Sequence, residues 1–237
     1  MEISPADTFH KEQTMTTVIA FDVNETLLDL RALDPHFEDL LGSAALRGQW
    51  FGQMLQLAFV GGLTGGYVDF STAQRAALRM LAERLGTPIT DEQVRAMVDR
   101  MRSLPPHPEV PGALAKLRDQ GDGLRVVALT NSTAEVAEDQ LRNAGIRDLF
   151  DAAFSADTVR ALKPAPAPYL AVAEAYSVPV AEVRLVAAHS WDVSGALAAG
   201  AAAAFVARPG MVLSPIGATP DIVGSDLADV VDQILAV

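Results

Sequence analysis

The chain has 237 residues, half of them hydrophobic, with a formal net charge of −12 and no cysteine. This length suits one α/β domain with an inserted subdomain, or two modest domains. The negative charge argues against nucleic-acid binding, which needs a basic face. The lack of cysteine excludes disulfides, thiol nucleophiles and cysteine-ligated zinc. No apolar run approaches the roughly 20 residues of a membrane span. We therefore expect a cytoplasmic protein with neither a nucleic-acid partner nor a membrane partner.

The first patterned stretch follows residues 1–15, which are polar and aperiodic and predict a flexible extension. An apolar run, Val18–Phe21, ends abruptly at Asp22, as in a buried strand of a parallel sheet. Asp22 then lies at the carboxyl end of the strand, where open α/β sheets place their ligands. The Thr26 hydroxyl is close enough in sequence to hold a carboxylate or a bound anion in place. Taken alone, Asp22 is equally suited to capping a turn or a helix.

The next block, residues 31–103, has apolar residues at helical spacing and no good strand. Glycines separate its segments, as helix ends and turns require, and Gln93 stands at the capping-box position after Thr90. The expected helices are Pro35–Leu41, Ala45–Val60, Phe70–Leu85 and Thr90–Arg102. We therefore predict an all-helical insertion between residues 16–30 and residues 104–237.

Beyond a proline-rich return loop, predicted strands and helices alternate to the end of the chain. The expected strands are Leu124–Leu129, Ala152–Ser155, Val183–Ala188, Ala203–Ala207 and Ile222–Val223. The expected helices are Ala113–Gln120, Ala134–Ala144, Pro166–Tyr176, Val193–Ala199 and Leu227–Leu235. Such alternation means parallel pairing with right-handed crossovers. The fold class is therefore α/β, a doubly wound parallel sheet with an inserted helical subdomain.

Polar residues recur where the predicted strands end, and these ends share one edge of a doubly wound sheet. They are Thr130-Asn131, then Lys163 with Tyr169 six residues beyond it, then the run His189 to Asp192. Each has an ordinary alternative: Thr130-Asn131 as a helix cap, Asp192 as the N-cap of a helix starting at Val193, His189 as a core residue, Lys163 as a solvated side chain. Their coincidence on one edge favours a functional site.

Together these motifs resemble those of the haloacid dehalogenase superfamily. The stretch from Asp22 to Thr26 resembles its first motif, with a nucleophilic aspartate. Thr130-Asn131 resembles the second motif, Lys163 the third and the segment around Asp192 the fourth. The resemblance covers the chain from about residue 16 and implies a Rossmann-like core, with residues 31–103 as the mobile cap.

Within that superfamily the sequence most resembles the L-2-haloacid dehalogenases. The matching residues are the pair Lys163/Tyr169, Trp191-Asp192 with Gly195-Ala196, and Tyr67-x-Asp69-Phe70. Superfamily phosphatases carry a second aspartate, their general acid, where this chain has Asn24.

The chain also departs from the dehalogenase pattern. The dehalogenases usually have tyrosine at the position of Asn24, and serine and asparagine at those of Ala187 and His189. Their cap arginine aligns near Phe51, and Arg47 is the nearest arginine here.

The resemblance implies hydrolysis of small 2-haloalkanoic acids through an ester on Asp22, with no cofactor and no metal. The implied catalytic residues are Asp22, Thr26, Lys163 and Asp192. The implied substrate-binding residues are Val23, Asn24, Thr130, Asn131 and Tyr169. The implied halide pocket is Arg47, Trp50, Phe51, His189 and Trp191. The expected partners are a haloacid substrate and halide, and a homodimer remains open.

A donor at His189 and a tight pocket also suggest fluoride release from fluoroacetate. Two other functions remain open at this point. One is a Mg²⁺-dependent small-molecule phosphatase of the same superfamily, and the other is a non-catalytic binding homologue.

Overall fold

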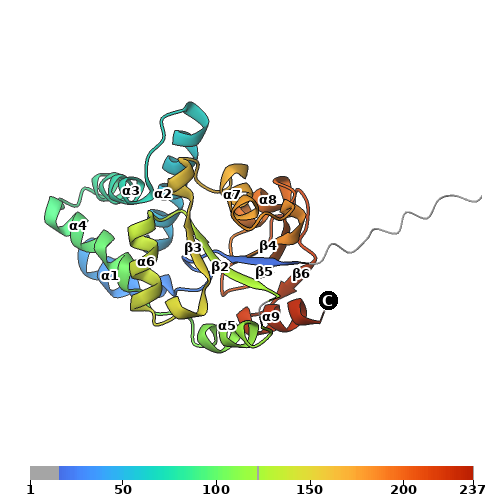
Figure 1. Cartoon of the computed structure of the whole chain (residues 1–237). Helices are drawn as coiled ribbons and strands as arrows, with labels where there is room; N and C mark the ends of the chain where they lie inside the picture. The colour runs from blue at the N-terminus through green and yellow to red at the C-terminus, as the bar shows by residue number, and fades with distance from the viewer. Residues whose placement is uncertain (1–15, 122, 237) are drawn as a thin grey trace, which may run out of the picture.

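A six-stranded parallel sheet forms the centre of the computed structural model, which describes residues 16–121 and 123–236 (Figure 1). The extension predicted for residues 1–15 lies outside the described residues. The strands are β1 (Val18–Phe21), β2 (Arg125–Thr130), β3 (Ala152–Ser155), β4 (Val183–Ala187), β5 (Ala202–Val206) and β6 (Ile222–Gly224). Their order is β3-β2-β1-β4-β5-β6, and every neighbouring pair is parallel. The predicted doubly wound α/β sheet is thus confirmed.

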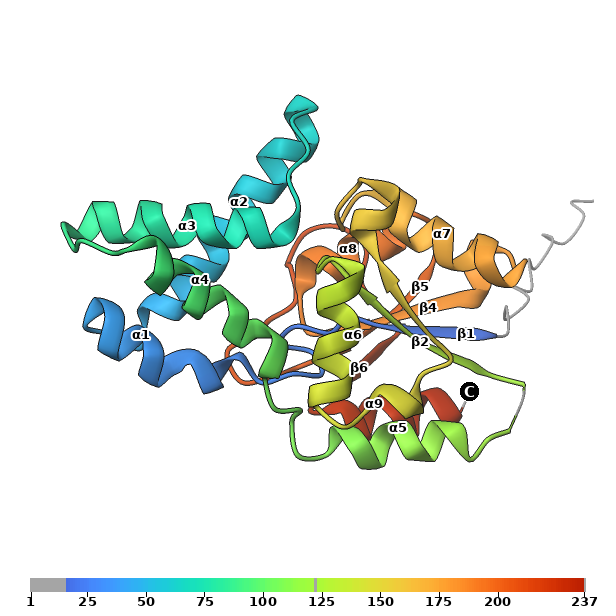
Figure 2. The same ribbon diagram turned by 60° about the vertical axis from the view of Figure 1, so that its left-hand side comes forward.

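Helices cover both faces of this sheet. Successive residues of a strand point to opposite faces, and here the residues on each face are apolar. Ile19 and Phe21 pack in one core cluster, and Val18 and Ala20 in another. The face that carries Ile19 and Phe21 is covered by α5 (Val110–Arg118), α6 (Ala134–Asn143) and α9 (Leu227–Leu235). The face that carries Val18 and Ala20 is covered by α7 (Pro166–Tyr176) and α8 (Ser190–Ala198) (Figures 1 and 2). Short 3₁₀ turns occur at Arg147–Leu149, Ala156–Val159 and Val180–Glu182.

A separate group of helices stands beside the sheet, as Figure 2 shows on its left. It comprises a 3₁₀ turn (Leu30–Leu33), α1 (Asp34–Leu41), α2 (Leu46–Thr64), α3 (Phe70–Leu85), α4 (Asp91–Asp99) and a second 3₁₀ turn (Arg100–Ser103). The capping box of Thr90 and Gln93 is confirmed. We propose that residues 31–103 form a cap on a core of residues 16–30 and 104–237. None of the described helices has the length and apolar character to span a membrane.

Several helices differ from the sequence prediction in their bounds, and α2 and α5 are two of them. Helix α2 continues beyond Val60 to Thr64, and a Cβ on Gly61 would lie 2.7 Å from the Gly66 carbonyl oxygen. The glycines there permit close backbone approach, and the helix ends only at Gly65, whose φ is 73°. Helix α5 begins at Val110 rather than Ala113, since Pro111 is tolerated in a first helical turn.

Helix α8 begins at Ser190, so the alternative of Asp192 as an N-cap is wrong. His189 is in the N-cap position, and Asp192 lies inside the first turn.

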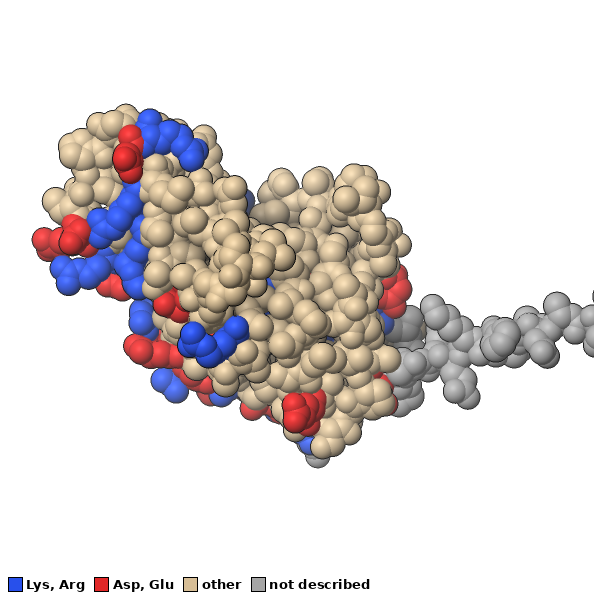
Figure 3. All heavy atoms as spheres, turned by 90° about the horizontal axis from the view of Figure 1, so that it is seen from above, with Lys and Arg blue, Asp and Glu red and all other residues tan. Residues whose placement is uncertain are grey.

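The strand order sets where the site forms. Strand β1 lies between β2 and β4, so the chain changes direction across the sheet beside Asp22. Ligands of open α/β sheets bind at such a point, outside the carboxyl ends of the strands. Seen from above, charged side chains gather toward the cap end, while the surface over the junction of cap and core is largely uncharged (Figure 3).

Candidate active site

Asp22 follows β1 directly and is almost fully buried, with 4% of its surface exposed. Its Oδ2 accepts a 2.6 Å hydrogen bond from the Thr26 hydroxyl. That hydroxyl in turn accepts from the backbone N–H of Ala188, at 2.9 Å. Thr26 therefore ties the Asp22 carboxylate to the end of β4 and fixes its orientation.

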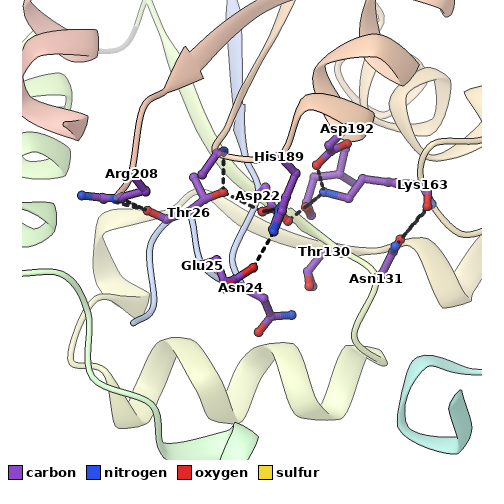
Figure 4. A network of polar contacts seen from close by, with 12 residues as sticks. Asp22, Asn24, Glu25, Thr26, Thr130, Asn131, Lys163, His189, Asp192 and Arg208 are labelled. Carbon is purple, nitrogen blue, oxygen red and sulfur yellow. Dashed lines mark hydrogen bonds and ion pairs between the residues drawn. The ribbon is translucent and has the colours of Figure 1, made fainter. Parts of the chain in front are cut away.

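Lys163 is the cation that faces Asp22, and its side chain is fully buried (Figure 4). Its Nζ donates to Asp22 Oδ1 at 3.0 Å, to Asp192 Oδ2 at 2.5 Å and to the Leu129 carbonyl at 2.8 Å. The Tyr169 hydroxyl donates to Asp192 Oδ1 at 2.5 Å. Three acceptors on separate segments of the chain, one of them Asp22 itself, thus hold the Lys163 ammonium group in place.

These contacts determine which groups are charged. Burial alone would raise the pKa of Asp22, but the Lys163 ammonium and His189 outweigh it, so the pKa lies well below its usual range. Burial would lower the pKa of Lys163, but Asp192 and Asp22 outweigh it and raise the pKa. Burial raises the pKa of Asp192. Asp22 is therefore an ionised carboxylate at neutral pH.

His189 lies between two carboxylates. Its Nδ1 is 3.2 Å from Asp22 Oδ2, and its Nε2 is 2.8 Å from Glu25 Oε2. Burial would lower the pKa of His189, but its hydrogen bonds to Asp22 and Glu25 raise the pKa to about 9. At neutral pH the ring is an imidazolium that donates from both nitrogens. His189 is therefore no inert core residue, and both of its donors are already engaged.

Glu25 was not among the residues singled out from the sequence, although it lies inside the first motif. Its backbone is left-handed, with a φ of 63°, a conformation that non-glycine residues seldom adopt. Two buried side chains hold this turn: His107 Nε2 donates to the Glu25 carbonyl, and Arg208 donates to the Thr26 carbonyl. His107 and Arg208 carry no spacing signal, since one is in the return loop and the other follows β5.

The predicted substrate-binding residues mostly hold loops. Asn131 donates to the Lys163 carbonyl and accepts from the Lys163 N–H. The Asn24 amide donates to Ser132 Oγ and accepts from Gln140 Nε2. Val23 is fully buried, and Thr130 Oγ1 accepts from the Ser132 N–H. Thr133 is the N-cap residue of α6, so the helix-cap alternative for Thr130-Asn131 is wrong.

Three of the predicted halide-pocket residues lie together. The His189 ring stacks between Phe51, at a centroid distance of 5.5 Å, and Trp191, at 5.1 Å. Trp191 Nε1 is buried and has no hydrogen-bond partner within the described part of the chain. A buried donor without a partner calls for an explanation, and a bound anion supplies one.

The other two lie elsewhere. The Trp50 ring packs on Phe37 inside the cap, and its Nε1 donates to the Gln74 carbonyl. The Arg47 guanidinium is paired with Asp34 and Glu25.

A cleft of about 590 Å³ opens between the cap and the core next to this aromatic stack. Phe59 and Tyr67 line it from the cap, and Leu162 and Pro164 from the core. Phe59 also packs edge-on against Trp191, so the cleft borders the stack directly. Across residues 16–121 and 123–236, no group of three or more His, Asp or Glu side chains is placed to hold a metal ion.

The chain belongs to the haloacid dehalogenase-like hydrolase family, whose model matches residues 16–200. It is 31% identical over 205 residues to haloacetate dehalogenase H-2 of Moraxella sp. (strain B), covering 86% of this chain and 91% of that protein. It is 28% identical over 216 residues to an (S)-2-haloacid dehalogenase of Pseudomonas sp. (strain YL), covering 90% of this chain and 92% of that protein.

A solved structure agrees with these relatives. The L-2-haloacid dehalogenase of Xanthobacter autotrophicus with covalently bound chloropropionic acid superposes with a TM-score of 0.86 at 26% identity, covering 93% of this chain and 99% of that chain. The resemblance inferred from the sequence is therefore confirmed.

Proposed function

We propose that this enzyme hydrolyses the carbon–halogen bond of small (S)-2-haloalkanoic acids and forms 2-hydroxy acids. The observation that carries the proposal is the buried, ionised Asp22 at the end of β1, held by Lys163 and Thr26. The names of the relatives, haloacetate dehalogenase and (S)-2-haloacid dehalogenase, support the substrate class.

The first half of the reaction is a displacement at carbon. One oxygen of the Asp22 carboxylate attacks C2 in line with the carbon–halogen bond, an ester bond forms, and the electron pair of the broken bond leaves with the halide. Lys163 and Thr26 hold the carboxylate in place, and the aromatic stack excludes water that would solvate it. In the Xanthobacter enzyme, chloropropionic acid is likewise covalently bound.

The second half needs a water molecule and a base. Asp192 is engaged with Lys163 and Tyr169, so its proposed role is to position Lys163. His189, oriented by Glu25, is the better base once it is neutral. Ester formation neutralises Asp22. His189 then has only one carboxylate partner, Glu25, to stabilise its protonated form. The released proton goes to solvent, and His189 then takes a proton from the water that attacks Asp22 Cγ. The bond between Cγ and the ester oxygen breaks, and the leaving alkoxide takes that proton from His189 to give the 2-hydroxy acid and the free Asp22 carboxylate.

The carboxylate of the substrate and the departing halide each need hydrogen-bond donors. For the carboxylate we propose Thr130, Asn131 and the backbone N–H groups where the chain leads into α6, because helix N-termini favour anions. For the departing halide we propose the unpartnered Trp191 Nε1.

Since His189 is closely enclosed by Phe51 and Trp191, we propose that small leaving groups are favoured, including fluoride from fluoroacetate. Trp191→Phe keeps a ring and removes the donor. It should lower the rate of fluoride release more than that of bromide release, because fluoride is the stronger hydrogen-bond acceptor. An unchanged ratio of the two rates would remove Trp191 from this role.

The direct test of the function is halide release from 2-chloropropionate with EDTA present. Wild type should turn over and Asp22→Asn should not, with both folded by circular dichroism. Asp232→Asn, at an exposed ion pair with Lys116, is the matched control and should keep full activity. Mg²⁺-dependent hydrolysis of p-nitrophenyl phosphate without halide release would identify a phosphatase instead. Turnover of neither substrate would favour a binding homologue.

A further inference from the structure

The Glu25 carboxylate links the cap to the nucleophile through two partners. Its Oε2 is 2.8 Å from His189 Nε2, and its Oε1 accepts from Arg47 Nη1 at 3.2 Å. Arg47 is on α2 of the cap, and its Nε also donates to Asp34 at 2.6 Å. An uninterrupted series of polar contacts therefore runs from Asp34 and Arg47, through Glu25 and His189, to Asp22.

The backbone and the side chain of Glu25 are held separately. The core holds the backbone, since His107 donates to the Glu25 carbonyl and Arg208 to that of Thr26. The carboxylate has only His189 and Arg47 as hydrogen-bonding partners among the described residues. These side chains are shielded from water, with 17% of Arg47 and 12% of Glu25 exposed, so their contact is screened less than a surface pair.

The charges around His189 follow a simple arrangement. Asp22 and Glu25 face its nitrogens, and the rings of Phe51 and Trp191 face its two sides. The cations of the network stand one group further away: Lys163 behind Asp22, and Arg47 behind Glu25. Arg47 thus does not contact His189, but it binds the Glu25 carboxylate, which also accepts a hydrogen bond from His189.

We propose that Arg47 is a positioning residue for ester hydrolysis, which holds the Glu25 carboxylate on His189 and so couples the closed cap to the second half of the reaction. This inference rests on the proposed function of Asp22. It assigns Arg47 a task other than binding the halide, because its guanidinium is already engaged by two carboxylates.

Two consequences distinguish this role from a purely structural one. Without Arg47, the Glu25 carboxylate loses the contact that fixes its direction, so water activation by His189 should slow while ester formation continues. The Glu25 contact also raises the pKa of His189, so its loss should lower that pKa. The rise of the hydrolysis rate with pH should therefore shift toward lower pH without Arg47.

The experiment is rapid-quench kinetics with 2-chloropropionate on wild type and on Arg47→Met, which keeps the length of the side chain and removes the charge. Arg47→Met should release a burst of about one halide per active site. It should then turn over on the order of tenfold more slowly, which is less than the ~10²–10⁴ that general-base assistance contributes, because His189 itself is still present. The ester on Asp22 should accumulate and be visible by mass spectrometry of the intact protein. Arg47→Lys should restore part of the rate and return the pH profile toward that of wild type.

Arg79→Met, which removes an exposed cap arginine paired with Asp91, is the control and should behave as wild type. Loss of the burst in folded Arg47→Met would place Arg47 in substrate or halide binding and overturn the proposal. An unchanged turnover rate, or a burst with an unshifted pH profile, would overturn it as well. If wild type itself releases no halide, the proposed function fails, and that outcome is distinct from the others.

Discussion

At the scale of single residues, Lys163 is the group on which the site depends most. It is fully buried between two carboxylates and makes its remaining hydrogen bond to the Leu129 carbonyl. Such a cation is tolerated in a core only because its partners satisfy it, and removing it leaves uncompensated buried charge.

Lys163→Met should therefore abolish halide release and lower the free energy of unfolding by about 3–5 kcal/mol, as for other broken buried ion pairs. The double variant Lys163→Met/Asp192→Asn removes one of the stranded charges and should recover part of that stability but none of the activity. Urea unfolding of both variants gives the comparison. A single variant as stable as wild type would show that the ion pairs around Lys163 do not form.

His189 gives a prediction about pH. Its pKa rises from 6.5 to about 9 on folding, so its pairing stabilises the native state fully below pH 6.5. That contribution is lost as the pH rises through 9. Wild type should therefore lose more stability across this range than His189→Asn, in urea unfolding followed by tryptophan fluorescence. Parallel stability profiles for the two proteins would mean that His189 is not held as an imidazolium.

The sequence predicted those residues of the site that belong to a superfamily motif and also follow the end of a predicted strand. Asp22, Thr26, Lys163, Tyr169 and Asp192 were identified in this way, and the structure places their side chains in one hydrogen-bonded group.

Glu25, His107 and Arg208 were missed, because their positions depend on a left-handed turn and on contacts between distant segments. Trp50 was placed in the halide pocket that the resemblance implies, but its ring packs on Phe37 inside the cap. No local pattern reveals the direction of that ring.

At the scale of elements, α8 illustrates how helix packing sets the site. Gly195 lies where an added Cβ would be 2.5 Å from Pro164 Cβ and 2.7 Å from the Tyr169 hydroxyl. Only glycine at this position lets α8 approach α7 so closely. Tyr169 of α7 can then reach Asp192, which is on α8 together with Gly195. The requirement is steric, because Gly195 is in the helix interior, where glycine is otherwise unfavourable.

Gly195→Ala should therefore lower both the stability and the rate of halide release, since Pro164 and Tyr169 must move away from Lys163 and Asp192. Gly52→Ala is the matched control, because nothing lies within 4 Å of a Cβ at that exposed position of α2. It should raise the free energy of unfolding by about 0.5–1 kcal/mol through helix propensity. If Gly195→Ala is as stable and active as wild type, the close packing of α7 and α8 has no part in the site.

The elements themselves were largely predictable, since β1, β3, α3, α7 and α9 have their expected bounds. The larger shifts, in α2, α5 and α8, lie at glycine, proline and polar residues, which also occur inside helices. Gly61 is inside α2, where the Gly66 carbonyl approaches it closely, and Asp192 is turned toward Lys163 rather than capping α8.

At the scale of the whole molecule, the cap and the core meet on both sides of the site. Arg47 reaches Glu25 on one side, and the Tyr67 hydroxyl donates to the Asp157 carboxylate on the other, with the Arg160 guanidinium over the Tyr67 ring. The alternation of strands and helices predicted a doubly wound sheet, but not its order. That order, which places β1 between β2 and β4, is what brings Asp22, Thr130 and His189 to one edge.

The proposed mechanism requires that Asp22 becomes esterified during turnover. The most direct test is a single turnover in ¹⁸O-water, with enzyme in excess over 2-chloropropionate and mass analysis of both the product and the peptide that contains Asp22. Because water attacks the Asp22 carbonyl carbon, the first product molecule should carry unlabelled oxygen from the protein, and the label should appear in the Asp22 carboxylate. Labelled 2-hydroxypropionate in the first turnover, with Asp22 unlabelled, would mean that water attacks the substrate directly and would contradict the mechanism.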